Sequence, residues 1–266
     1  MLTYPFMRDA LVASFFISIL CGVMGVFVVA RQTAFFAHTL SEIGFSGAAF
    51  GIFSGISPIL GMLLFTIASS LLIGTFGNQA NRRQSSISVF SGFFIGLGIL
   101  FLALAKTQAS YATDILFGSI VGINSGNVKT LVVLSLIILA ILFWVYRKLK
   151  YNSFDRIGAK YNVNWNLPIS ILFLVLLACT VSVTAQIVGA LLIFVLLTIP
   201  ASAARYLVHT VSGMIELSFL FALIGTWLGL YLSYLTNWPV SAFIATIESI
   251  IYLISLAWHH FEGDYD

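Results

Sequence analysis

His38 and Glu42 lie four residues apart in a stretch, residues 36–51, that is otherwise apolar and rich in small side chains. In a helix, residues four apart share one face. An ionisable side chain at membrane depth costs about 2.5 to 3.5 kcal/mol on insertion scales, so two of them in one apolar run indicate a function. Imidazole and carboxylate groups are ligands of divalent transition metals. The spacing therefore predicts a metal-binding pair.

The composition excludes a soluble globular protein. Of the 266 residues, 60% are hydrophobic and 8% are charged, and the mean hydropathy is +1.07, whereas a soluble domain carries about 25% charged residues. The basic residues form short clusters between apolar runs and no basic face, so no nucleic-acid partner is expected. The expected fold class is all-α, a polytopic transmembrane bundle surrounded by membrane lipid.

Apolar runs of about 17 to 25 residues predict nine spans, or eight if the short seventh run does not cross the membrane. The nine runs cover residues 9–30, 33–53, 58–77, 86–105, 126–146, 168–185, 187–201, 214–235 and 240–259. Pro58, Pro168 and Pro239 lie at predicted starts, where a missing N–H is tolerated, and Pro200 is expected to close the seventh span. Residues 1–266 are expected to form a single transmembrane domain.

The Lys and Arg residues predict the orientation. If the basic segment 147–167 is a cytoplasmic loop, alternation of the spans places nine of the twelve Lys and Arg residues in the cytoplasm. Arg8, Lys106 and Lys129 then lie outside. The positive-inside rule selects this arrangement, with the N-terminus outside the cell and the C-terminus in the cytoplasm.

Residues 186–207 contain the pattern V-G-x-L-L followed by P-A-x-x-A-R, and residues 230–241 contain Leu-Tyr-Leu-Ser-Tyr and Trp-Pro-Val-Ser. Shorter characteristic segments lie at 5–11, 25–31, 116–118 and 153–155. In this order, over nearly the whole chain, they resemble the permease subunits of the ABC-3 family of metal-ion ABC transporters, which carry zinc, manganese or iron.

The resemblance implies an all-helical, vitamin-B12-importer-like permease (a type II ABC importer) in the bacterial plasma membrane. The implied partners are two cytoplasmic ABC ATPase subunits that bind ATP, an extracytoplasmic metal-binding protein and a second permease subunit, which is either another copy of this chain in a homodimer or a close paralogue. The implied cargo is a divalent metal ion, and no permanently bound cofactor is expected. The chain contains no G-x-x-x-x-G-K-[ST] motif, so ATP hydrolysis is expected on a partner and the chain itself is not expected to be an enzyme.

The resemblance also implies a coupling helix at about residues 201–213, which docks on the ATPase. The residues expected to contribute are Ala201, Ser202, Arg205, His209 and Gly213. The distribution of basic residues places this segment in the cytoplasm, and Ser212 with Gly213 is expected to cap it. Without a docking partner, Arg205 and His209 would be ordinary interfacial anchors.

The metal-binding pair departs from the family pattern. Many members read D-A-L-S-H here, with the carboxylate first, whereas this chain reads His38-Thr-Leu-Ser-Glu42. One nitrogen and one carboxylate are kept, but the metal stays open, because such a pair suits zinc, manganese and iron. A tetrahedral site needs two further ligands. Glu248, in the ninth predicted span, is the best remaining acidic candidate.

Alternatives to this interpretation remain. His38 can bond a backbone carbonyl, and Glu42 or Glu248 can be a neutral acid that holds two helices together. An ion-coupled secondary transporter would use His38 and Glu42 as a proton relay, but it would need inverted repeats that the sequence does not display. A membrane scaffold, or a permease for a chelated metal of the siderophore or cobalamin type, are the other candidates.

Overall fold

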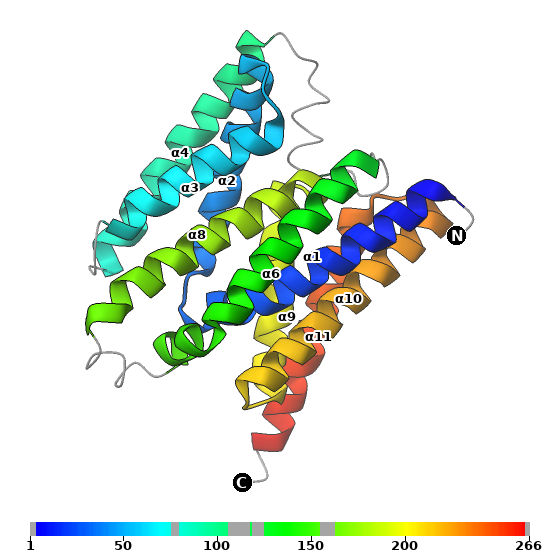
Figure 1. The fold of residues 1–266 in the computed structure, drawn as a ribbon. Coiled ribbons are helices and arrows are strands. Elements are labelled where there is room, and N and C mark those ends of the chain that lie inside the picture. Colours follow the sequence, from blue (N-terminus) through cyan, green and yellow to red (C-terminus); the bar gives the residue numbers. More distant parts are fainter. Residues whose placement is uncertain (1–3, 76–79, 106–117, 119–124, 155–162, 264–266) are drawn as a thin grey trace. The chain divides into compact units, whose positions relative to one another are not determined.

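The computed structural model describes residues 4–75, 80–105, 118, 125–154 and 163–263. Within these residues the regular structure is α-helical (Figure 1). The helices are α1 Pro5–Ala30, α2 Ala34–Ser54, α3 Pro58–Thr75, α4 Ala80–Leu104, α6 Ser125–Phe154, α8 Val163–Val188, α9 Ala190–Leu207, α10 Val211–Thr236 and α11 Val240–Gly263.

Each predicted span coincides with one of these helices, but several helices extend beyond the apolar run. α6 has 30 residues, a length of about 45 Å, whereas the hydrocarbon core of a bilayer is about 30 Å thick. Both ends of the predicted loop over 147–167 are helical, because α6 continues to Phe154 and α8 begins at Val163, and its residues 155–162 lie outside the described part of the chain. Hydropathy marks the part of a helix that lies in lipid, and helical hydrogen bonding continues past it.

Proline marks a helix start at one of the predicted positions and lies inside a helix at two others. Pro58 is the first residue of α3, whereas Pro168 lies inside α8 and Pro200 lies inside α9. Membrane helices tolerate internal proline because neighbouring helices and Ser or Thr side chains satisfy the freed backbone groups. Pro200 therefore does not end α9, which continues to Leu207.

Six helices of the described chain are long and apolar enough to cross a membrane: α1, α6, α8, α9, α10 and α11. Shorter apolar stretches lie in α3 and α4, at Pro58–Gly74 and Val89–Leu104. α2 is outside this set, since His38, Glu42 and several Gly and Ser residues lower its hydropathy. The polytopic membrane architecture is supported, and the count of nine spans stays a prediction.

The chain divides into two compact units, each assembled from separate stretches. Unit 1 consists of residues 1–34, 119–136 and 192–266, and unit 2 consists of residues 35–118 and 137–191. The prediction of one domain over residues 1–266 stays a prediction about the whole chain.

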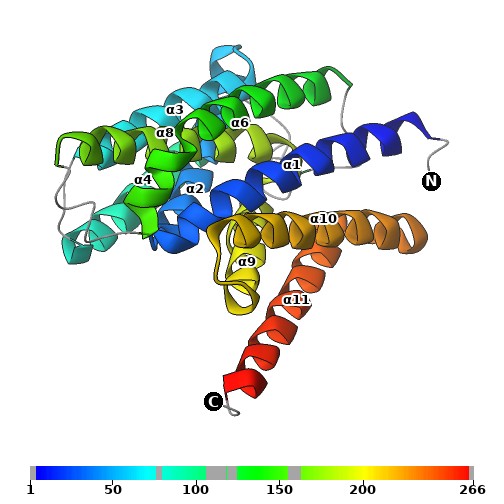
Figure 2. The same cartoon turned by 60° about the horizontal axis from the view of Figure 1, so that its bottom comes forward.

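In unit 1, α1 packs along α10, and α10 packs along α11 (Figures 1 and 2). Ser18 and Thr226 join α1 to α10 through a hydroxyl pair at 3.1 Å. Gly22 permits this approach, because a Cβ atom there would lie 2.7 Å from the Cα atom of Phe219. Gly225 and Gly229 of α10 contact α11.

In unit 2, α2 packs against both α3 and α4, and α3 packs along α8. The backbones of α2 and α3 touch where Gly47 meets Gly61, and Gly98 of α4 lies against Phe45 and Ser46 of α2. Thr66 and Ser182 join α3 to α8 with a hydroxyl pair at 2.7 Å. α2 is thus held between other helices, which positions its polar side chains.

Candidate metal site

α2, which carries the predicted metal-binding pair, has a well-defined end. Gly55 follows its last residue with φ +76°, and the amides of Gly55 and Ile56 bond the carbonyls of Ile52 and Gly51. This is the Schellman arrangement, in which a glycine in the left-handed region closes a helix. His38 and Glu42 lie in the first half of the helix, away from this end.

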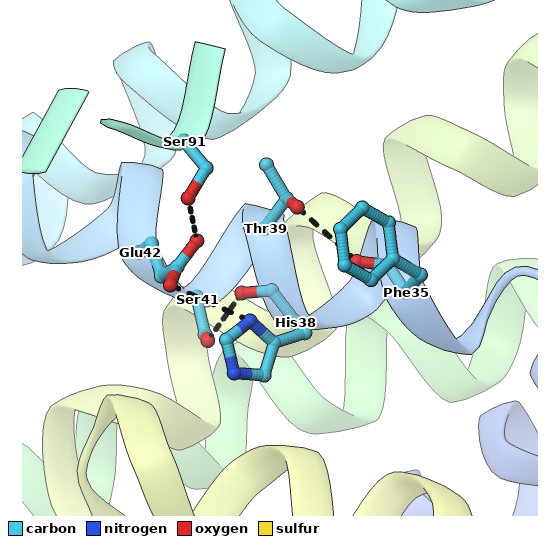
Figure 3. Close-up of polar contacts among 6 residues, drawn as sticks. All are labelled: Phe35, His38, Thr39, Ser41, Glu42 and Ser91. Carbon is cyan, nitrogen blue, oxygen red and sulfur yellow. Dashed lines mark hydrogen bonds and ion pairs between the residues drawn. The ribbon is translucent and has the colours of Figure 1, made fainter. Parts of the chain in front are cut away.

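The predicted pair is formed. His38 Nδ1 lies 3.5 Å from Glu42 Oε1, as Figure 3 shows, and the side chains are 35% and 19% exposed. Beside the pair, Ser41 Oγ donates to the backbone carbonyl of His38 at 2.6 Å. The pair therefore combines a partly accessible imidazole nitrogen with a mostly buried carboxylate.

A third side chain reaches the pair from another helix, and the sequence did not indicate it. Ser91 of α4 donates its hydroxyl hydrogen to Glu42 Oε2 (Figure 3). The two residues are 49 positions apart, so no local periodicity connects them. The only signal was a small polar residue inside the predicted span 86–105. Glu42 thus has one oxygen toward His38 and the other toward α4.

Glu248 lies in unit 1, on α11, and is completely buried. Neither of its carboxylate oxygens has a hydrogen-bond partner within the described part of the chain. Its carboxyl group lies on the backbone of α10 at Gly225, where an added Cβ atom would be 2.7 Å from Glu248 Cδ. Burying a carboxyl group without a hydrogen-bond partner is costly, so Glu248 is the strongest candidate in unit 1 for an acidic metal ligand.

The described residues contain no group of three or more His, Cys, Asp or Glu side chains arranged to hold a metal ion. The His38–Glu42 pair therefore offers two ligands, and Ser91 adds a hydroxyl beside them.

The predicted coupling helix over 201–213 is not a separate helix. Ala201, Ser202 and Arg205 belong to the last turns of α9, residues 208–210 are not helical, and Gly213 lies in the first turn of α10. Thr210 is the N-cap of α10, since its hydroxyl accepts the amide hydrogen of Gly213 at 3.3 Å. The prediction that Ser212 and Gly213 cap the end of a coupling helix was wrong. α9 continues through Pro200 to Leu207, and both residues lie in the first turn of α10.

The side chains of this segment differ in exposure. Arg205 and His209 are exposed, Ser202 and Gly213 are half-buried, and Ala201 is buried. Arg205 is in the last turn of α9, where the helix dipole favours a cation.

The end of α9 is held against α11 by an aromatic group. The hydroxyls of Tyr206 and Tyr252 are 3.4 Å apart, and the ring centroids of Tyr206 and His259 are 5.4 Å apart. The segment 201–213 thus carries the exposed guanidinium of Arg205 and the exposed imidazole of His209 close to the end of α9 that packs on α11.

The sequence profile of the ABC 3 transport family matches residues 3–259. The manganese transport system membrane protein MntC of Listeria monocytogenes is 30% identical over 267 residues, which are 99% of this chain and 94% of that protein. The manganese import system permease protein ScaB of Streptococcus parasanguinis is 27% identical, over 95% of this chain and 90% of its own.

Two solved structures share the fold. The structure of PsaBC from Streptococcus pneumoniae in complex with Fab contains a chain with a TM-score of 0.84 and 28% identity, covering 95% of this chain and 91% of that one. An inward-facing ABC transporter assigned to the metal-chelate type has a TM-score of 0.72 at 18% identity, over 94% of this chain and 85% of its own. The second likeness concerns the fold alone.

Proposed function

The chain belongs to the ABC 3 transport family, and we propose that the ion it imports is manganese. It is the membrane permease subunit of a metal-ion ABC importer. The observation that supports manganese is near full-length similarity to relatives named for manganese transport and import. The side chains accept this cargo without selecting it, because one imidazole nitrogen and one carboxylate suit zinc, manganese and iron alike.

We propose that His38 and Glu42 form a transit site for the cation. Their facing atoms, Nδ1 and Oε1, belong to adjacent turns of one helix. A divalent ion cannot cross hydrocarbon without polar groups that replace its water, and this pair supplies one nitrogen and one charged oxygen. Water and hydroxyl oxygens would complete the coordination shell.

Glu248 is proposed as a further ligand on the ion's path. The support is its burial and the lack of a hydrogen-bond partner for either oxygen among the described residues. A cation that binds there would offset the cost of an isolated buried carboxylate.

The remaining partners follow from family membership as proposals. Two copies of the chain would bind two cytoplasmic ATPases in a type II, vitamin-B12-importer-like assembly of nine spans per copy, and a binding protein would deliver the metal from outside. ATP-driven closure of the ATPases would move residues 201–213 and change the side to which the transit site opens.

The N-terminus would be outside the cell and the C-terminus in the cytoplasm. A fluorescent protein fused to the C-terminus would then mature, and a reporter enzyme that is active only in the periplasm would stay inactive.

The test is transport by the reconstituted permease with its ATPase. Proteoliposomes are supplied with manganese, zinc or iron, and the metal accumulated with ATP is measured by elemental analysis. We expect manganese to accumulate in wild type and neither His38→Ala nor Glu42→Ala to transport it. Wild-type uptake by both variants would remove the pair from the mechanism, and preferential uptake of zinc or iron would overturn the manganese assignment.

Thr39→Val is the matched control for these two variants. Thr39 lies between His38 and Glu42 in the sequence and is buried. Its hydroxyl donates to the backbone carbonyl of Phe35 at 3.2 Å (Figure 3). Valine has nearly the same shape, so this variant should reach the membrane and transport like wild type.

A further inference from the structure

Ser91 connects α4 to the metal-binding pair on α2. Its hydroxyl donates to Glu42 Oε2, while Glu42 Oε1 faces His38 Nδ1 (Figure 3). Glu42 is 19% exposed, so water competes weakly for its oxygens. A hydroxyl that donates to a carboxylate forms a charge-assisted hydrogen bond, which is stronger than a neutral one. Both oxygens of Glu42 are thus assigned to different partners.

This bond restricts the rotation of the carboxylate. The terminal torsion of a glutamate side chain is broad when nothing holds it, so the direction of Oε1 depends on what holds Oε2. Partners of metal ligands that act in this way orient the ligand and are commonly worth about 10- to 100-fold in metal affinity.

We propose that Ser91 is a positioning residue of the cation site and that it limits Glu42 to binding a cation through one oxygen. The inference rests on the proposed function of His38 and Glu42. Mn²⁺ can be bound by a carboxylate through one oxygen, with water and imidazole completing the shell. Ca²⁺ takes six to eight oxygens and often uses both oxygens of a carboxylate. Occupation of Oε2 by Ser91 therefore discriminates against Ca²⁺.

The contact that brings Ser91 to α2 is built into the packing of unit 2. Two turns farther along α4, Gly98 lies against Phe45 and Ser46 of α2, where an added Cβ atom would be 3.1 Å from Ser46 Cα. Phe45 belongs with Ala49 and Leu102 to a buried apolar cluster between the same two helices. The hydroxyl of Ser91 is thereby held at a fixed position relative to Glu42.

The experiment measures ATP-driven manganese uptake by the permease–ATPase complex over a range of Mn²⁺ concentrations, with and without Ca²⁺. For Ser91→Ala we expect the KM for Mn²⁺ to rise about 10- to 100-fold with an unchanged maximal rate, and Ca²⁺ to inhibit at lower concentrations than in wild type. Ser91→Thr keeps the hydroxyl and should restore both values. Ser91→Cys, a weaker donor of similar size, should be intermediate.

Ser46→Ala is the matched control. Ser46 lies on α2 at the same interface with α4, is buried, and has no hydrogen-bond partner among the described residues. This variant should retain the wild-type KM and response to Ca²⁺.

The outcomes separate this inference from the proposed function. If His38→Ala and Glu42→Ala lose uptake while Ser91→Ala keeps the wild-type KM and response to Ca²⁺, the role of Ser91 is overturned and the transit site stands. A lower maximal rate with an unchanged KM would also overturn it, because that result reports packing alone. Wild-type uptake in His38→Ala and Glu42→Ala would instead remove the site itself.

Discussion

Among single residues, Glu42 and Glu248 differ in how the protein accommodates them. Glu42 is partly exposed and has partners on two helices, His38 on α2 and Ser91 on α4. Glu248 is completely buried, and its oxygens lack hydrogen-bond partners among the described residues. Because an ionised carboxylate in such a place is costly unless it is compensated, a cation bound at Glu248, as proposed, would offset a larger cost than one bound at Glu42.

Replacing Glu248 with Gln tests this difference. Glutamine keeps the shape of the side chain and removes its charge, so we expect manganese uptake to fall about tenfold or more while thermal stability is maintained. Uptake by proteoliposomes and thermal unfolding of the purified permease are the two measurements. Glu216→Gln, at an exposed acid near the start of α10, should transport like wild type. A fully active Glu248→Gln protein would assign Glu248 to helix packing.

At the scale of helices, glycines spaced four residues apart lie at a helix contact in α2 and α10 but not in α4. Gly47 and Gly51 of α2 do meet α3, and Gly225 and Gly229 of α10 meet α11. Gly92 and Gly96 of α4 have the same spacing, yet a Cβ atom at either would meet no atom of the described residues within 4 Å. Spacing shows that small residues share a face of a helix, but only packing shows whether another helix covers that face.

Gly47→Ala should destabilise the crossing of α2 with α3. The added methyl group would lie 2.9 Å from the Cα atom of Met62 and also against the peptide of Gly61, so the backbones must separate. Overpacking of this kind costs about 1 to 3 kcal/mol, which thermal unfolding of the purified permease would detect. Gly92→Ala is the control and should be as stable as wild type. Equal stability of the two variants would show that the crossing does not need glycine.

At the scale of the whole molecule, the segment 201–213 is the part of the chain that we propose couples the permease to the ATPase. It joins α9 to α10, presents Arg205 and His209 to the surroundings, and is supported by the contact of Tyr206 with Tyr252 and His259. A short non-helical segment between two packed helices would transmit a displacement of the ATPase to the membrane helices better than a flexible loop would, because α9 and α10 would move together with it.

Arg205→Glu should reduce the amount of ATPase that co-purifies with the permease, since reversing a charge at a docking surface replaces an attraction with a repulsion. Membrane insertion should be unchanged. Arg147→Glu, at an exposed arginine of α6, is the control and should co-purify normally. Wild-type co-purification of Arg205→Glu would contradict the docking assignment.

The sequence by itself determined the features that depend on local order. Long apolar runs predicted the helices, because a chain in lipid must satisfy its backbone hydrogen bonds within each segment. The spacing of His38 and Glu42 placed both on one face of α2, because helical periodicity is a local property. The family was also evident at this level, because its motifs are short runs of residues that follow one another in a set order along the chain.

The tertiary structure alone decided which helix faces meet and where helices end. The bond from Ser91 to Glu42, the burial of Glu248 against Gly225 and the contact of Gly47 with Gly61 each join residues on different helices. Such contacts depend on how side chains of distant segments fit together, which no periodicity encodes. The same reason explains why α8 and α9 continue through Pro168 and Pro200, where neighbouring groups in the packed bundle can satisfy the backbone that proline leaves unbonded.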